Sequence, residues 1–211
     1  MVNNIRVYDL AESIYRSGYP MMTEMPDCNT YDRETREIGY QIAERRFDAP
    51  HIKRAINLAN AKGGGHDQFL SGILVSFDLT ASNKMWVELE RYRYITFVSS
   101  GSTMHRASQF SLTQCTNEYV DTTIIAKCKQ LQNEYNTIDA EEFPEAKRDA
   151  YLRLLYNLPS GFELTAGLTT NYRCLKNVYE QRHNHRLPEW RSFCSEFIAN
   201  LPMADKLIIG E

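Results

Sequence analysis

The sequence lacks an excess of positive charge, and it lacks any long apolar run. Lys and Arg together number 24 against 27 Asp and Glu, which gives a formal net charge of −3. A chain of this charge has no large field with which to hold a polymeric nucleic acid, so small ligands are the better expectation. No window approaches the roughly 20 apolar residues that cross a bilayer, and the N-terminus has no apolar signal core. We therefore expect a soluble, cytoplasmic protein with neither membrane nor nucleic acid polymer among its partners.

The sequence also lacks the cysteine patterns that bind metals or form disulfide frameworks. Its five cysteines include no CxxC pair and are odd in number, which suits neither a zinc site nor paired disulfides. His183 and His185 are two residues apart and do not share a helix face, so we predict no metal site. A glycine-rich dinucleotide fingerprint is missing too. The glycine run 63–65 is too short for one, and we interpret it as a turn.

The chain has no internal repeat and no linker long enough to separate two domains, so we expect a single domain over residues 1–211. Helices outnumber strands and the two are interleaved, which predicts an α/β or α+β fold with one modest sheet flanked by helices. A long loop is expected over 10–32. Strands are expected over 73–79, 94–98 and 162–169. Helices are expected over 33–46, 49–61, 82–91, 122–135, 144–156, 171–181 and 188–201.

Arg182 occupies an unusual place in the expected helix over 171–181. Leu175, Val178 and Tyr179 form an apolar stripe at i, i+3 and i+4, and the next member of that stripe, at i+7, is Arg182. Burying an unpaired guanidinium costs several kcal/mol, so Arg182 should meet an anion, a carbonyl-rich ligand or a buried carboxylate.

Arg93 repeats this arrangement after the expected helix over 82–91, because Trp86 and Leu89 set a stripe that continues at Arg93. A plainer interpretation exists for both arginines. A cation near a helix C-terminus stabilises the macrodipole by about 0.3–1 kcal/mol, and a long stem can reach water. The residue pattern alone leaves both interpretations open.

Three separated stretches, which cover about half of the chain, carry a more specific pattern. The first is His66-Asp67-Gln68-Phe69-Leu70 with the strand that follows. The second is Arg91-Tyr92-Arg93 followed by Ser99-Ser100-Gly101-Ser102. The third is Leu158-Pro159 followed by Asn171-Tyr172-Arg173, Asn177, Arg182 and Arg186. Together they resemble the flavin-dependent thymidylate synthase family. Agreement of spacing across separated segments is harder to reach by chance than one short motif.

The resemblance implies a flavin-dependent thymidylate synthase-like fold with a small mixed or antiparallel sheet. It also implies a reaction in which dUMP is methylated at C5, with methylenetetrahydrofolate as carbon donor, hydride transfer through FAD, and NADPH as reductant. Reduced flavin would supply the hydride, so no cysteine nucleophile is needed. Family members assemble as tetramers with sites shared between subunits, so the resemblance implies a homotetramer.

Roles for individual residues follow from the same resemblance. Arg182 would grip the pyrimidine base and polarise its carbonyl as the catalytic residue. The implied cofactor contacts are His66, Gln68, Arg91, Tyr92, Arg93, Asn171, Arg173, Asn177 and Arg186. The implied nucleotide contacts, besides Arg182, are Glu88, Arg91, Arg93, Ser102 and Arg106.

The chain departs from the family pattern at several positions. Tyr92 stands where the family has histidine, Ser102 falls one residue late, and Met104 and Leu155 stand where the family has arginines. An alternative within the same class is therefore a pyrimidine hydroxymethylase or other base-modifying enzyme, as would suit a phage that alters its DNA. Two other classes stay open: a non-catalytic flavin- or nucleotide-binding protein, and a structural protein in which Arg182 and Arg93 pair with buried carboxylates.

Overall fold

A computed structural model of the protein describes residues 1–61 and 65–210. Its residues divide into two compact units, and each is described by itself below. The first unit comprises Met1–Phe77, Tyr92–Thr96 and Leu168–Glu211; the second comprises Asp78–Arg91 and Phe97–Gly167. The expectation of one domain over the whole chain stays a prediction. Gly63 and Gly64, two residues of the expected glycine turn, lie outside the described residues.

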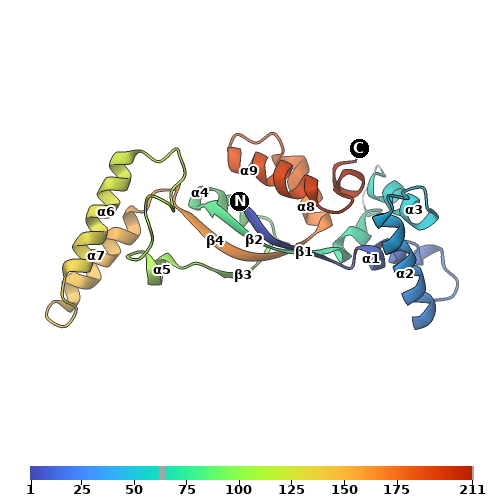
Figure 1. The fold of residues 1–211 in the computed structure, drawn as a ribbon, viewed down its shortest axis with the longest axis horizontal. Helices are drawn as coiled ribbons and strands as arrows, with labels where there is room; N and C mark the ends of the chain where they lie inside the picture. Colours follow the sequence, from blue (N-terminus) through green and yellow to red (C-terminus); the bar gives the residue numbers. More distant parts are fainter. Residues whose placement is uncertain (62–64, 211) are drawn as a thin grey trace. The chain divides into compact units, whose positions relative to one another are not determined.

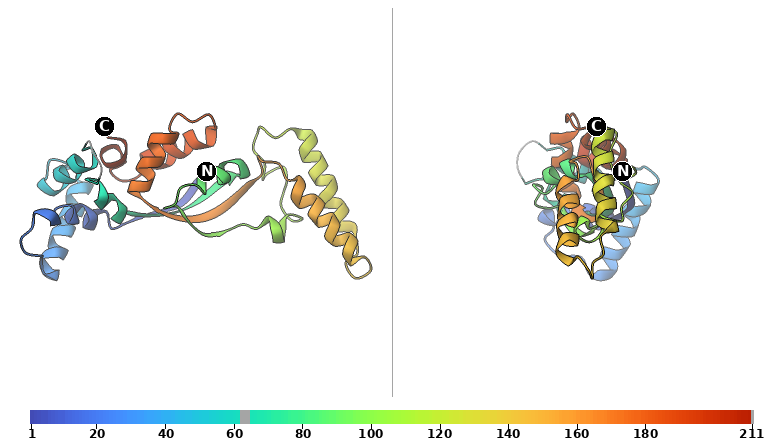
Figure 2. Two further views of the ribbon diagram at one scale, coloured as in Figure 1. Left: turned by 180° about the vertical axis from the view of Figure 1, so that it is seen from behind. Right: turned by 90° about the vertical axis from the view of Figure 1, so that its left-hand side faces the viewer.

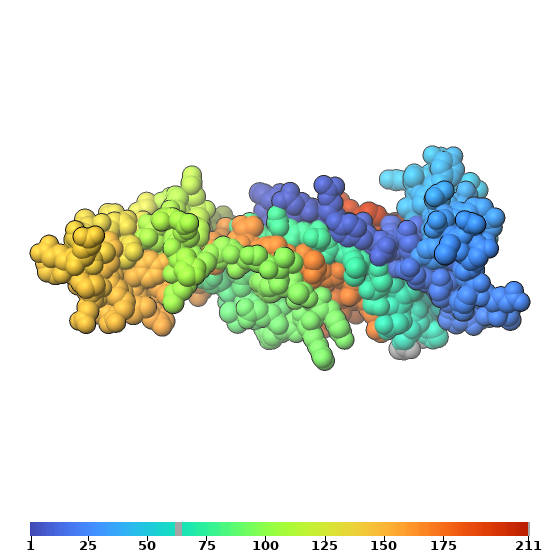
Figure 3. Space-filling view, turned by 90° about the horizontal axis from the view of Figure 1, so that it is seen from below, coloured from blue at the N-terminus to red at the C-terminus, as the bar shows by residue number. Residues whose placement is uncertain are grey.

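The strands form a four-stranded antiparallel sheet in the order β1-β2-β4-β3 (Figure 1). The strands are β1 (Val2–Tyr8), β2 (Leu74–Ser82), β3 (Thr96–Ser100) and β4 (Glu163–Asn171). Alternation in β2 places Val75, Phe77 and Leu79 on a buried face, as the sequence predicts. The mixed helix and sheet architecture confirms the predicted fold class. Strand β1 was not predicted; it is largely exposed, and its residues lie on the surface in dark blue in Figure 3.

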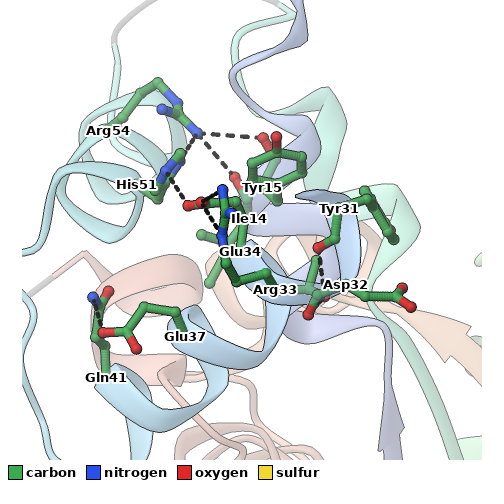
Figure 4. A network of polar contacts seen from close by, with 11 residues as sticks. Ile14, Tyr15, Tyr31, Asp32, Arg33, Glu34, Glu37, Gln41, His51 and Arg54 are labelled. Carbon is green, nitrogen blue, oxygen red and sulfur yellow. Dashed lines mark hydrogen bonds and ion pairs between the residues drawn. The ribbon is translucent and has the colours of Figure 1, made fainter. Parts of the chain in front are cut away.

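Helices of the first unit begin where the sequence predicted a long loop, and that prediction is wrong. Helix α1 (Leu10–Arg16), a 3₁₀ turn (Tyr19–Met21) and α2 (Cys28–Ala43) occupy or enter the range 10–32, and α3 (Pro50–Ala59) follows. Arg54 of α3 donates from Nη2 to the carbonyl oxygens of Ile14 and Tyr15, at 3.3 Å each (Figure 4). These carbonyls belong to the last turn of α1, where carbonyl oxygens have no N–H partner within the helix. They also accept from Ser17 Oγ at 2.6 Å and from the N–H of Gly18 at 3.0 Å. A contact from about 40 residues downstream therefore stabilises a helix that local pattern does not predict.

The C-terminal part of the first unit holds its aromatic core. Helix α8 (Tyr172–Arg182) is followed by α9 (Pro188–Ser192) and a π-helical turn (Phe193–Phe197). A 3₁₀ turn (Ile198–Asn200) and a second π-helical turn (Asp205–Ile209) complete this part of the chain. Trp190 is fully buried, and the ring centroids of Phe77 and Phe197 lie 4.6 Å apart. The single helix expected over 188–201 is therefore broken into segments.

The second unit contains α4 (Asn83–Leu89), α5 (Thr103–Arg106), α6 (Thr122–Thr137) and α7 (Pro144–Asn157). Helices α6 and α7 lie side by side as a hairpin (Figure 2). Ala107, Leu131 and Leu154 form its small core. Both helices begin where the sequence predicts, because Asp121 caps α6 and Pro144 occupies the first turn of α7. No helix in the described part of the chain is long and apolar enough to span a membrane.

Candidate functional site

Helix α8 presents the strongest cluster of predicted site residues, and Arg182 lies in its last turn. Leu175 and Val178 are fully buried and Arg182 is half-buried, so the apolar stripe does end in a guanidinium that is drawn toward the protein. Its Nε donates to the hydroxyl of Tyr92 at 2.8 Å. Its Cζ lies 4.9 Å from the ring centroid of Trp190, within range of a cation–π interaction. The guanidinium is therefore held by an aromatic surface and a hydroxyl group.

Tyr92 connects Arg182 to a further predicted residue. The Tyr92 hydroxyl donates to Oε1 of Gln181 at 2.9 Å, and Nε2 of Gln181 donates to Oδ1 of Asn177 at 2.9 Å. Nη1 of Arg182 lies 2.8 Å from Nε2 of His185. All five residues belong to the first unit. The structure thus brings together Asn177, Tyr92 and Arg182, which the sequence assigned from two separate stretches.

The beginning of α8 joins the first and third stretches. Arg173 donates from Nε to Oδ1 of Asp67 at 3.1 Å and from Nη1 to Oε1 of Gln68 at 2.5 Å. Lys176 lies 3.7 Å from the other carboxylate oxygen of Asp67. Asn171 caps the helix by accepting from the backbone N–H of Cys174 at 2.9 Å. Two cations, one carboxylate and one carboxamide therefore converge at the start of this helix.

The expected placement of Arg93 is wrong. Helix α4 ends at Leu89, so its stripe does not extend to residue 93. Tyr92 is buried instead, with 7% of its surface exposed, and Arg93 is exposed. The residue that continues the apolar surface is the aromatic one, because the backbone after Leu89 no longer has a helical period. His66 and Arg186 are also exposed.

The remaining predicted residues belong to the second unit. Glu88 is buried, with 7% of its surface exposed, and its Oε1 lies 3.2 Å from Nζ of Lys84. Arg91 is exposed. Ser102 precedes α5 without a side-chain cap, and exposed Arg106 donates to Oε1 of Gln109 at 2.6 Å.

Sequence reasoning missed three members of the cluster around α8: Gln181, His185 and Trp190. His185 was considered only as a metal ligand, although a tight turn after Arg182, in which the His185 N–H donates to the Arg182 carbonyl at 2.9 Å, brings the two side chains together. Within the described ranges, no three His, Cys, Asp or Glu side chains are placed to hold a metal ion together. Trp190 could have been found as the one tryptophan in the expected last helix that follows Arg182.

The cysteines near this cluster are buried thiols. Burial raises the pKa of Cys194 to about 11, and the positive charge of Arg182 opposes that shift. Burial also raises the pKa of Cys174. Both groups therefore stay protonated near neutral pH and lack the thiolate that a cysteine nucleophile needs.

Comparison with known proteins identifies the class of fold. No family model matches the chain, and no curated protein matches it. Solved structures do match, and the fold is that of the flavin-dependent thymidylate synthases.

Three of these solved structures are individually similar to the chain. Thymidylate synthase X from Helicobacter pylori, with FAD and dUMP, has a TM-score of 0.55 and 13% identity over 81% of this chain and 89% of that chain. A second structure of the same enzyme with FAD and dUMP has a TM-score of 0.55 and 13% identity, over 80% of this chain and 89% of that chain. The UMP/dUMP methylase PolB from Streptomyces cacaoi, bound with 5-Br dUMP, has a TM-score of 0.53 and 13% identity, over 94% of this chain and 88% of that chain.

Proposed function

We propose that this protein is a flavin-dependent enzyme that modifies the pyrimidine ring of dUMP. The specific reaction proposed is methylation at C5, with methylenetetrahydrofolate as carbon donor and NADPH as reductant. The fold supports this proposal, since the similar structures were solved with FAD and dUMP or with a dUMP analogue. The spacing of the three sequence stretches supports it independently. The phage origin and the homotetramer stay predictions.

One observation carries the proposal: the half-buried guanidinium of Arg182 on its aromatic support. A guanidinium in fixed orientation can donate to a pyrimidine carbonyl and stabilise the negative charge that develops there when the ring is attacked. Its contacts with Tyr92 and Trp190 hold the charge before a substrate arrives, so little reorganisation is needed. Arg182 is therefore the proposed catalytic residue.

The first turn of α8 fits a flavin dinucleotide. Arg173 and Lys176 offer charged donors for a diphosphate, and a phosphate would compete with Asp67 for them. Exposed Asn177 offers an amide to the cofactor one turn further along. Flavin would supply hydride chemistry when bound. We propose His66, Gln68, Asn171 and Arg186 as additional cofactor contacts.

The nucleotide contacts proposed outside α8 follow from the sequence resemblance. They are Glu88, Arg91, Arg93, Ser102 and Arg106. The exposed arginines among them are open to an anionic group, and buried Glu88 is already paired with Lys84. A base-modifying variant such as a hydroxymethylase is the second candidate, because Tyr92 replaces the family's histidine and takes part in holding Arg182.

The test combines a spectrum with a tritium-release assay. Purified protein should show flavin absorbance, and with methylenetetrahydrofolate and NADPH it should release tritium from [5-³H]dUMP. Arg182→Ala should abolish release and keep the flavin bands, whereas Arg36→Ala, which removes an exposed arginine of α2, should change neither. A colourless protein that takes up no FAD would overturn the proposal. Flavin without dUMP binding would favour the non-catalytic class.

Light scattering tests the assembly. A homotetramer of the 24.5 kDa chain is expected. A monomer in solution would contradict a site shared between subunits.

A further inference from the structure

The side chain of Tyr92 is unusually constrained for a residue outside a helix or strand. Only 7% of its surface is exposed, and its ring packs edge-on against Trp190, with centroids 5.8 Å apart. Its hydroxyl accepts from Nε of Arg182 and donates to Oε1 of Gln181. We infer that Tyr92 is a positioning residue, which sets the orientation of the Arg182 guanidinium for the reacting base. This inference rests on the proposed function.

The hydrogen bonds around Tyr92 all run in one direction. Arg182 donates to Tyr92, Tyr92 donates to Gln181, and Gln181 donates to Asn177. Because Tyr92 and Gln181 each accept one bond and donate the next, each bond polarises its neighbour, and the chain strengthens as a whole. The acceptor on Gln181 fixes the rotation of the Tyr92 hydroxyl, so its lone pair faces Nε of Arg182. A phenylalanine at position 92 would keep the ring and lose this link.

Two further contacts hold the guanidinium from other sides. His185 meets Nη1 at 2.8 Å, and the indole ring of Trp190 lies 4.9 Å from Cζ. The planar guanidinium therefore has its Nε edge on Tyr92 and one Nη on His185, with an aromatic ring nearby. The Nε–H has one fixed direction within the planar guanidinium, so the Tyr92 hydroxyl that accepts it fixes the orientation of that plane. Loss of the Tyr92 hydroxyl should loosen orientation while the charge stays in place.

The experiment compares Tyr92→Phe with Tyr172→Phe in full-length, flavin-loaded protein. Tyr172 is a matched control, because it is a buried tyrosine of the same unit whose hydroxyl donates to the Pro202 carbonyl at 2.7 Å. The first readout is hydrogen exchange of the Arg182 Nε–H, followed by NMR on ¹⁵N-arginine-labelled protein and assigned with Arg182→Lys. Losing a hydrogen bond to a charged group should speed this exchange about tenfold or more in Tyr92→Phe. Tyr172→Phe should leave it unchanged.

The second readout is dUMP chemistry. Tyr92→Phe should weaken dUMP binding and lower tritium release by about tenfold each, with the flavin spectrum unaltered. In an Arg182→Ala background the same change should add nothing further, since the two residues act together. Gln181→Leu removes the acceptor of the Tyr92 hydroxyl together with the donor to Asn177, and it should give a smaller loss of both exchange protection and activity. This variant serves if Tyr92→Phe folds poorly.

The two readouts separate the two proposals. Unchanged Arg182 exchange in Tyr92→Phe and Gln181→Leu overturns the positioning role, whether or not the protein binds dUMP. Faster exchange in a protein that binds neither FAD nor dUMP overturns the proposed function, and the positioning role for catalysis is lost with it. Faster exchange with dUMP affinity and turnover at the unaltered level also overturns the positioning role.

Discussion

Replacing Arg173 with alanine should affect cofactor binding far more than stability. The guanidinium Nε lies 3.1 Å from Oδ1 of Asp67, and the two side chains are 40% and 24% exposed. Solvent screens a pair of this exposure, so it contributes about 0.2–1 kcal/mol to the free energy of unfolding. A charged hydrogen bond from Arg173 to a flavin phosphate would contribute about 1.5–3 kcal/mol, or roughly 10- to 150-fold in Kd.

Titration of protein into FAD, followed by quenching of flavin fluorescence, measures the Kd for FAD, and urea unfolding measures the free energy of unfolding. Arg33→Ala is the matched control, because Arg33 forms a comparable 3.0 Å surface pair with Glu34 and lies outside the proposed site. The control should lose little stability and no FAD affinity. If Arg173→Ala binds FAD as tightly as the unaltered protein, Arg173 is not at the cofactor. A stability loss of several kcal/mol would instead make the Asp67 contact structural.

Three further predictions concern stability and thiol reactivity. Burial, and to a lesser extent the charge of Arg54, lower the pKa of His51, so the folded state favours the neutral ring. The free energy of unfolding should therefore fall as pH decreases below about 6.5. Urea unfolding at a series of pH values should show a shallower fall in His51→Phe. Iodoacetamide at pH 8 should label exposed Cys28 and leave folded Cys194, with its pKa raised to about 11, unlabelled by peptide mass spectrometry; equal labelling would contradict this. Leu154→Ala should cost about 2–5 kcal/mol of unfolding free energy, because Leu154 is fully buried. Tyr156→Ala, at an 82% exposed position, should change it by no more than about 0.5 kcal/mol. Similar urea midpoints for the two variants would refute the hairpin core.

The sequence predicted the elements whose signals are local. Alternation identified β2, and the starts of α4 and α8 were predicted at Ser82 or Asn83 and at Thr170 or Asn171. The caps are Ser82 and Asn171, whose side chains each accept from a backbone N–H three residues on. Such caps act within one turn of helix, so neighbouring residues contain the whole signal. The apolar stripe of α8 likewise singled out Arg182.

Other features were beyond local pattern. Arg54 contacts the end of helix α1 from 40 residues away, and Arg93 turned outward because α4 ended before its stripe reached that residue. The predicted continuous last helix divides into short segments around a buried aromatic core. In these cases the structure depends on a contact from elsewhere in the chain, or on a helix that ends earlier than the apolar pattern predicts.

By itself, the sequence determined the class of fold, the central strands, the main helices and one misplaced charge. Only the tertiary structure decided that Tyr92 would hold that charge and that Asp67 would meet Arg173. These pairs are separated by 90 and 106 residues along the chain. A hydrogen bond needs its two groups within about 3 Å, and no periodicity within a segment of sequence specifies which distant segment will supply the partner.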